Sequence, residues 1–132
     1  MLKMAIITGF LSQTKDRFHE YNQPLDLDQK FKLLSNIDGY DGVEIVYPYE
    51  VNDPQATRQV LDKHGLNIAA VNVNVKAEPE FRNGGLTSRD KAIRDKAVRF
   101  IKEAKEFAAA AGADKVTCCP LGDGYEFAFQ YD

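Results

Sequence analysis

The sequence has little of what marks several classes of protein. Its two cysteines, Cys118 and Cys119, are neighbours, and neighbours on a strand point to opposite faces, so no disulfide is expected between them. A net charge of −3 leaves no basic field for nucleic-acid phosphates. No apolar run could cross a bilayer, and the first ten residues lack the features of a signal peptide. We therefore expect a cytoplasmic protein without a membrane or nucleic-acid partner.

Two common kinds of site are also missing from the sequence. A dinucleotide-binding fold would place a glycine-rich G-x-G-x-x-G turn after its first strand, but residues 8–14 read TGFLSQT, and no P-loop occurs. The only histidines are His19 and His64, and no carboxylate cluster has the spacing of metal ligands. We therefore predict neither a nucleotide site nor a metal site in this chain.

The chain does contain a regular alternation of strands and helices. With 132 residues and 44% apolar composition, it has the size and core of one globular domain. Apolar runs rich in β-branched residues predict strands at 4–10, 42–48, 67–75 and 114–120. Apolar residues at helical spacing, with capping residues, predict helices at about 26–37, 53–65 and 88–111. Asp26 with Gln29, Asp53, and Thr87 or Ser88 are the expected caps.

This alternation predicts an α/β fold with parallel strands and helical crossovers. Two architectures qualify: an open doubly wound sheet, or part of a (β/α)8 barrel. The connections from helix to strand are short, whereas those from strand to helix are long and polar. Both architectures place ligand sites in such loops, at the carboxyl ends of the strands.

Three polar residues on the predicted strands favour the barrel. Glu44 alternates with Val43 and Ile45, and Asn72 and Asn74 alternate with valines. An open sheet covered by helices on both faces offers such side chains no polar surroundings, whereas a barrel lumen opens into the site. An unpaired buried carboxylate is costly, so Glu44 needs a partner or water. Glu44 and Asn72 either line the site or bond neighbouring strands, and we expect Asn74 to line it.

Three segments carry a resemblance to a known family. GYDGVEIVYPYEVND at 39–53, FRNGGLTSRDKAIRDKAVRFIKEAKEFAAAAGADKVT at 81–117 and PLGDGYEFAFQYD at 120–132 resemble the xylose-isomerase-like TIM-barrel proteins, which are sugar and sugar-phosphate isomerases and epimerases. The resemblance implies a complete barrel of about 250 residues. It implies a divalent metal, such as manganese, magnesium, cobalt or zinc, on two glutamates, an aspartate and a histidine in the second half.

The resemblance therefore implies that residues 1–132 form a single partial barrel domain of four strands and three helices, about half a TIM barrel, truncated before the fourth helix. No catalytic or metal-binding residue is expected within it, and its role is to line the pocket of a small sugar or sugar phosphate. By position at the strand ends, the expected pocket residues are Phe10, Ser12, Glu44, Tyr47, Asn74, Lys76, Asp123 and Tyr125.

The expected function is that of the amino-terminal half of a metal-dependent sugar or sugar-phosphate isomerase or epimerase, inactive by itself. A non-catalytic half-barrel that binds or assembles with a partner is the alternative. Such a half leaves two strand edges unpaired, so we expect a homo-oligomer or a complex with a carboxyl-terminal half. The related barrel endonucleases are a weaker match, because the chain is acidic and has no basic face.

Overall fold

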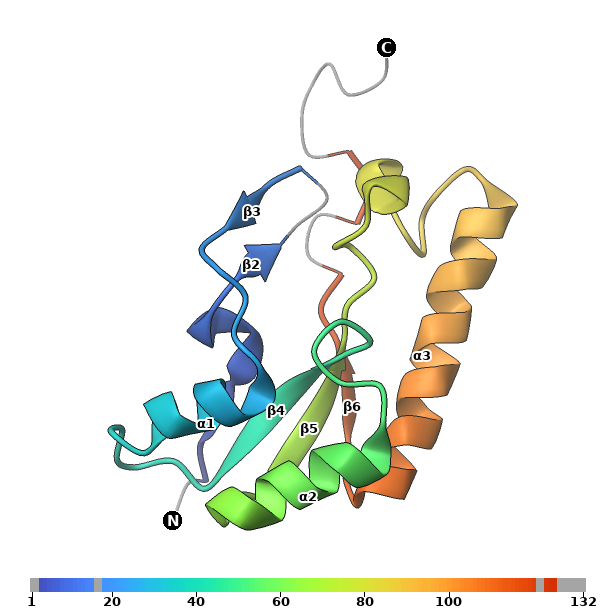
Figure 1. The fold of residues 1–132 in the computed structure, drawn as a ribbon. Coiled ribbons are helices and arrows are strands. Elements are labelled where there is room, and N and C mark those ends of the chain that lie inside the picture. Colours follow the sequence, from blue (N-terminus) through green and yellow to red (C-terminus); the bar gives the residue numbers. More distant parts are fainter. Residues whose placement is uncertain (1–2, 16–17, 121–122, 126–132) are drawn as a thin grey trace.

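The structure is a computed structural model that describes residues 3–15, 18–120 and 123–125. Strands and helices follow one another as the sequence predicts (Figure 1). The strands of the main sheet are β1 (Ala5–Ile7), β4 (Gly42–Tyr47), β5 (Ile68–Val73) and β6 (Val116–Cys118). The helices are α1 (Leu27–Leu34), α2 (Pro54–His64) and α3 (Lys91–Ala111).

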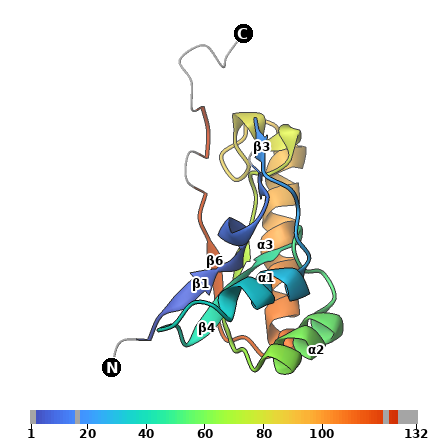
Figure 2. The ribbon, with the colours of Figure 1, turned by 60° about the vertical axis from the view of Figure 1, so that its left-hand side comes forward.

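The four strands lie in the order β1-β4-β5-β6, and every neighbouring pair is parallel. Sequential order is the arrangement of a barrel wall, whereas a doubly wound sheet reverses direction after its first strands. The prediction of an α/β fold with four parallel strands and three helices is therefore confirmed. Figure 2 shows the helices gathered on one side of the sheet, as on the outside of a barrel.

The core lies between the sheet and these helices. Val43, Ile45, Val71 and Val73 are almost completely buried and pack with apolar residues of α1, α2 and α3. Ala97, Ala104 and Ala108 form a buried stripe on α3, and Phe100 and Phe107 add to it. Glu44 and Asn72, which lie between these residues, point to the opposite face, because side chains alternate along a strand.

The helix caps agree with the sequence at α1 and α2 and differ at α3. Asp26 and Gln29 form the predicted capping box, and Asp53 accepts hydrogen bonds from the first turn of α2. Helix α3 begins three residues later than expected, with Asp90 as its cap. Thr87 instead bonds to Asp123, to which its backbone N–H and its hydroxyl both donate.

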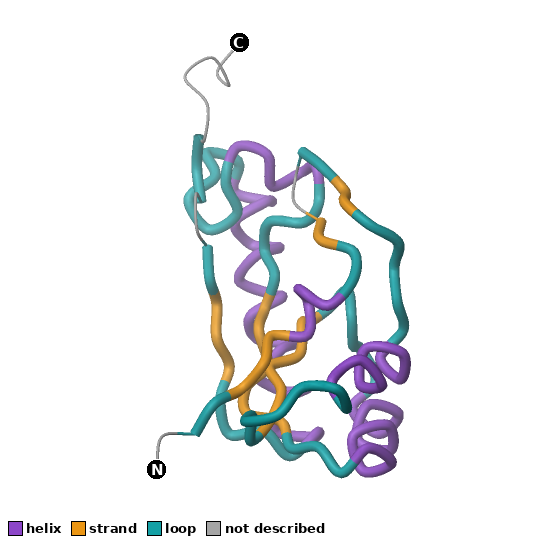
Figure 3. Tube along the Cα trace, turned by 90° about the vertical axis from the view of Figure 1, so that its left-hand side faces the viewer, coloured by secondary structure: helices purple, strands orange, loops and turns teal. Residues whose placement is uncertain are grey.

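Several short elements were not predicted. The 3-10 helices η1 (Thr8–Leu11) and η2 (Pro79–Asn83) follow β1 and β5, and β2 (Thr14–Lys15) pairs antiparallel with β3 (Glu20–Tyr21). These elements belong to the long connections that extend beyond the carboxyl ends of the strands (Figure 3). Among the described helices, none has both the length and the apolar character needed to cross a membrane.

Candidate functional site

An open cavity of about 650 Å³ lies at the carboxyl ends of the strands, a size typical of sites for small molecules. The segment after β1, the turn after β4 and the end of β5 contribute to its wall, as do the start of α1 and the residues before it. The polar side chains on the wall include Ser12, Lys30, Glu50, Asn72, Asn74 and Lys76. The long connections therefore enclose a polar cavity where a parallel α/β fold places its ligand.

A buried ion pair lies in this wall. The ammonium group of Lys30, on α1, contacts the Glu50 carboxylate, and both side chains are only 7% exposed. The second Glu50 oxygen accepts a hydrogen bond from the Val46 backbone N–H at 2.8 Å and contacts the Thr8 hydroxyl. That hydroxyl also lies 3.1 Å from the Glu44 carbonyl oxygen. The pair thus connects α1 to the ends of β1 and β4.

A second polar group crosses the sheet on the face opposite the helices. Oε1 of Glu44 accepts hydrogen bonds from Asn72 Nδ2 at 2.7 Å and from Thr117 Oγ1 at 2.6 Å. Asn72 and Thr117 also lie 3.1 Å apart and occupy paired positions on β5 and β6. These bonds supply the partner that the sequence requires for Glu44. Asn72 reaches the cavity wall, whereas Glu44 lies outside it and bonds across the strands.

Four of the predicted pocket residues lie on the cavity wall: Phe10, Ser12, Asn74 and Lys76. Phe10 is 73% exposed at the mouth, whereas Ser12 is buried. The Asn74 side chain is engaged with the backbone, because Oδ1 accepts from the N–H groups of Lys76 and Ala77 at 2.9 and 3.0 Å. Asn74 thereby shapes the turn that carries Lys76.

The other predicted residues lie outside the cavity wall. Tyr47 faces the helices because it follows the lumen-facing Val46 on the strand, and its ring lies 5.5 Å from that of Phe107. Burial and the nearby Glu103 raise the pKa of Tyr47. Asp123 instead organises the loop before α3, accepting from the N–H groups of Gly85 and Thr87. Tyr125 is 42% exposed and away from the wall.

Four residues on or beside the cavity wall were not predicted from the sequence: Thr8, Lys30, Tyr49 and Glu50. Glu50 follows a predicted strand end, which is a usable signal for a site residue in a parallel fold. Lys30 has a weaker signal: it lies three residues after Leu27 and four before Leu34, on the apolar side of α1. A lysine is nevertheless ordinarily expected in solvent. Tyr49 donates to Glu78 at 2.9 Å, and burial followed by this carboxylate raises the pKa of its hydroxyl, which stays protonated at neutral pH.

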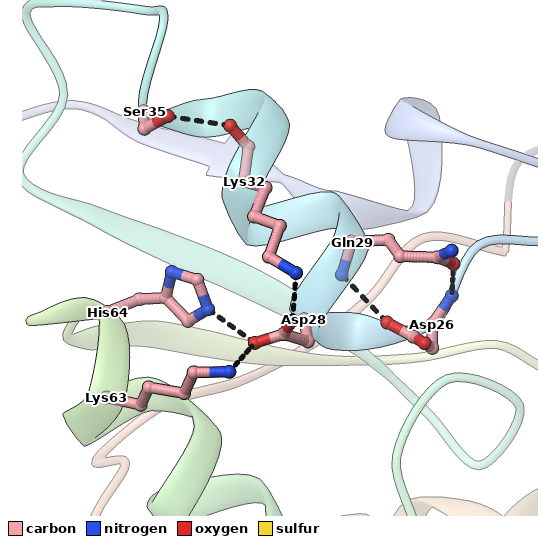
Figure 4. A network of polar contacts seen from close by, with 7 residues as sticks. All are labelled: Asp26, Asp28, Gln29, Lys32, Ser35, Lys63 and His64. Carbon is pink, nitrogen blue, oxygen red and sulfur yellow. Dashed lines mark hydrogen bonds and ion pairs between the residues drawn. The ribbon is translucent and has the colours of Figure 1, made fainter.

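A further charged cluster lies away from the cavity, between α1 and α2 (Figure 4). The carboxylate of Asp28 contacts Lys32 at 2.8 Å, Lys63 at 2.6 Å and the His64 ring at 2.7 Å. These contacts, with Lys32 first, hold the pKa of Asp28 well below its usual range. The His64 ring also packs edge-on against Phe31. His64, in the last turn of α2, thus joins two helices.

Within the described residues, no three histidine, cysteine or carboxylate side chains form a group that could hold a metal ion. On the wall, the Glu50 carboxylate is engaged with Lys30 and that of Asp26 with the first turn of α1. Glu44, outside the wall, is engaged with Asn72 and Thr117. The described residues therefore do not fit the metal that the family resemblance implies.

A sequential parallel β/α wall with a polar cavity at its carboxyl end defines the class of TIM-barrel proteins. The profile of the xylose isomerase-like TIM barrel family matches residues 31–129, and the chain belongs to this family.

Curated relatives and a solved structure agree with this assignment. The chain is 35% identical to the xylose isomerase of Thermus caldophilus and 32% identical to that of Thermus thermophilus, in each case over 69 residues. Each match covers 52% of this chain but only 18% of the relative's length. The apo structure of 3-keto-D-glucoside 4-epimerase YcjR from E. coli aligns with a TM-score of 0.59 at 18% identity. It covers 88% of this chain and 37% of that protein, and this likeness shows the fold.

Proposed function

We propose that this chain forms one wall of the sugar site of an isomerase or epimerase that acts on a small sugar or sugar phosphate in the cytoplasm. The observation that carries the proposal is the polar cavity at the carboxyl ends of β1, β4 and β5. The family and the xylose isomerase relatives support a sugar as its ligand.

The chemistry of the wall suits a polyhydroxylated ligand. Lys30 and Lys76 offer N–H donors, and Ser12 offers a hydroxyl that both donates and accepts. Asn72 offers its Oδ1 as an acceptor, because its Nδ2 already bonds Glu44 and Thr117. Exposed Phe10 at the mouth provides an apolar surface for the carbon skeleton. In this proposal, the chain binds and orients the sugar, and it does not catalyse the reaction by itself.

The divalent metal of the family belongs elsewhere in the complete site. We propose that it is held by residues other than those described here, and that it polarises the carbonyl group of the sugar when bound. No proton transfer is assigned to a residue of this chain.

A second candidate is a half-barrel that binds or assembles with a partner without catalysis. It is favoured by the main sheet, which ends at β1 and β6 with no further strand among the described residues. Such edges pair readily with another chain. A homo-oligomer or a complex with a carboxyl-terminal half would cover them.

Nuclear magnetic resonance titration with D-xylose and with D-xylulose 5-phosphate tests the sugar site. We expect the backbone amide signals of Ser12, Asn74 and Lys76 to shift with at least one of these ligands, while those of exposed Lys63 and Asp114 stay constant. If neither ligand shifts the cavity signals, the sugar-site proposal is wrong.

Co-expression with the carboxyl-terminal half of a family member tests the enzymatic part. We expect sugar isomerisation or epimerisation that a chelator abolishes. A folded, metal-loaded complex that is inert toward aldoses, ketoses and their phosphates would leave the assembly candidate in its place.

A further inference from the structure

The ammonium group of Lys30 belongs to a side chain that is 7% exposed, as is its partner Glu50 on the same cavity wall. The residue is 5% exposed, although lysine is among the residues that are least often buried. An ammonium group has three N–H donors. Its only carboxylate contact within the described part of the chain is Glu50. Donor capacity therefore remains at a position that lines the cavity.

The residues around Glu50 hold this ammonium group in one place. Glu50 accepts from Val46 N–H at 2.8 Å and contacts Thr8, which is completely buried. Both ends of the carboxylate are thus anchored, one to Lys30 and one to the ends of β1 and β4. Stability alone does not require such a pair, because apolar residues of similar volume often stabilise a protein equally well or better.

We propose that Lys30 donates a hydrogen bond to an uncharged oxygen of the ligand, a sugar hydroxyl or carbonyl, and that Glu50 and Thr8 position it for this task. The proposal rests on the proposed function and assigns Lys30 as a specificity residue of the same cavity. Placement of the donor by anchored groups lowers the ordering cost of binding.

The charge around Lys30 favours an uncharged oxygen over a phosphate. Glu50 already neutralises the ammonium group, and a phosphate placed there would lie near the Glu50 carboxylate. Like charges at short range in a partly buried site repel. Lys76, also on the wall, has no carboxylate contact among the described interactions, so a phosphate has a better place there. Lys30 therefore selects the neutral end of the ligand.

The test compares ligand binding by the full chain and by two variants. Lys30→Met leaves the buried Glu50 carboxylate unpaired and endangers the fold. The double variant Lys30→Met, Glu50→Gln removes both charges, and the glutamine oxygen can still accept from Thr8 and Val46. Glu50→Gln alone is the control for loss of the carboxylate, because it keeps the ammonium group. It lowers stability, because Lys30 then lacks its counterion. Circular dichroism checks that each variant is folded.

The probes are D-xylose and inorganic phosphate, followed by nuclear magnetic resonance. We expect D-xylose to bind the double variant about 10- to 100-fold more weakly than the Glu50→Gln control, the usual effect of losing one charged hydrogen bond. Phosphate affinity should change by less than about threefold, below the effect of one neutral hydrogen bond. A direct measurement covers the case of an unfolded variant: the ε-methylene signal of Lys30 in the unmodified chain should shift on addition of D-xylose.

Each result decides the question. If D-xylose binds the chain, but the Lys30 signal and the affinity of the folded double variant do not change, the inference is wrong and the sugar site stands. If the double variant loses phosphate affinity as strongly as xylose affinity, the assignment to an uncharged oxygen is wrong. If D-xylose does not bind the unmodified chain, the Lys30 assignment fails. Only failure of D-xylulose 5-phosphate as well overturns the sugar site.

Discussion

Two carboxylates in this chain attract cations from helix α1, and they do so in opposite surroundings. Glu50 holds Lys30 where both side chains are 7% exposed. Asp28 is 26% exposed and holds Lys32 and Lys63, whose side chains are 65% and 62% exposed. Asp28 and Lys30 are only two residues apart on the helix, so they point to different sides of it.

The two clusters differ in how far water can reach their charges. Around Asp28, solvent screens the attraction and can replace a lost partner, so each contact contributes little. Around Glu50, both side chains are almost completely shielded from water, so removing one partner leaves a buried charge without a counterion. The exposed cluster therefore joins α1 and α2 with little effect on stability. The buried pair holds the Lys30 ammonium group in place at the cavity.

The largest expected effect is that of breaking the buried pair. We expect Glu50→Ala to lower the free energy of unfolding by about 3–5 kcal/mol, because the Lys30 ammonium group loses its counterion in a buried place. Urea unfolding at neutral pH measures the change. The double variant Lys30→Met, Glu50→Gln should recover most of the loss. A loss below about 1 kcal/mol for Glu50→Ala would show that water reaches the pair and that the two clusters are alike.

A smaller effect is expected at the turn after β5, on the same cavity wall. Asn74→Ala removes the oxygen that accepts from the N–H groups of Lys76 and Ala77. We expect the free energy of unfolding to fall by about 1–2 kcal/mol, as when a helix cap is lost.

Asn67→Ala is the matched control for that turn, because Asn67 is exposed just before the same strand begins. Its effect should stay within about 0.5 kcal/mol. Equal losses in the two variants, measured by urea unfolding, would contradict the special role of Asn74.

The smallest effect is expected at Asp28, and it shows in how stability changes as the pH falls into the acid range. The contacts with Lys32, Lys63 and His64 lower the pKa of Asp28 in the folded chain below its ordinary value of 3.8. Its contribution is therefore present above that pH and is lost as the pH falls below it, because protonation of the carboxylate then favours the unfolded chain. Thermal unfolding of Asp28→Asn should depend less on pH below about 4 than that of the unmodified chain.

Asp38→Asn serves as the control for this comparison, because it removes the same charge from an exposed position between α1 and β4. It should leave the acid side of the stability curve as it is in the unmodified chain. A curve for Asp28→Asn that matches the unmodified chain would show that the exposed cluster contributes nothing to stability.

The sequence by itself determined the order of the elements and the faces of the strands. These features depend on periodicities of two and 3.6 residues and on caps such as Asp26 and Asp53, all of which are local. Glu44 and Asn72 were recognised as polar residues on the lumen side for the same reason. Of the pocket residues, Phe10, Ser12, Asn74 and Lys76 were placed on the wall because strand ends define the site.

Only the tertiary structure decided which polar groups meet. Lys30 and Glu50 are separated by 20 positions, and Glu44 and Thr117 by 73. Helical spacing places Lys30 on the apolar side of α1, three residues after Leu27 and four before Leu34, whereas Lys32 lies on the other side. Spacing does not show that Glu50 is its partner. Lys30 and Glu50 meet only when α1 packs against η1 and α2, which leaves Lys30 buried and Lys32 in water. Burial, and with it the strength of a charge, is a property of the packed chain.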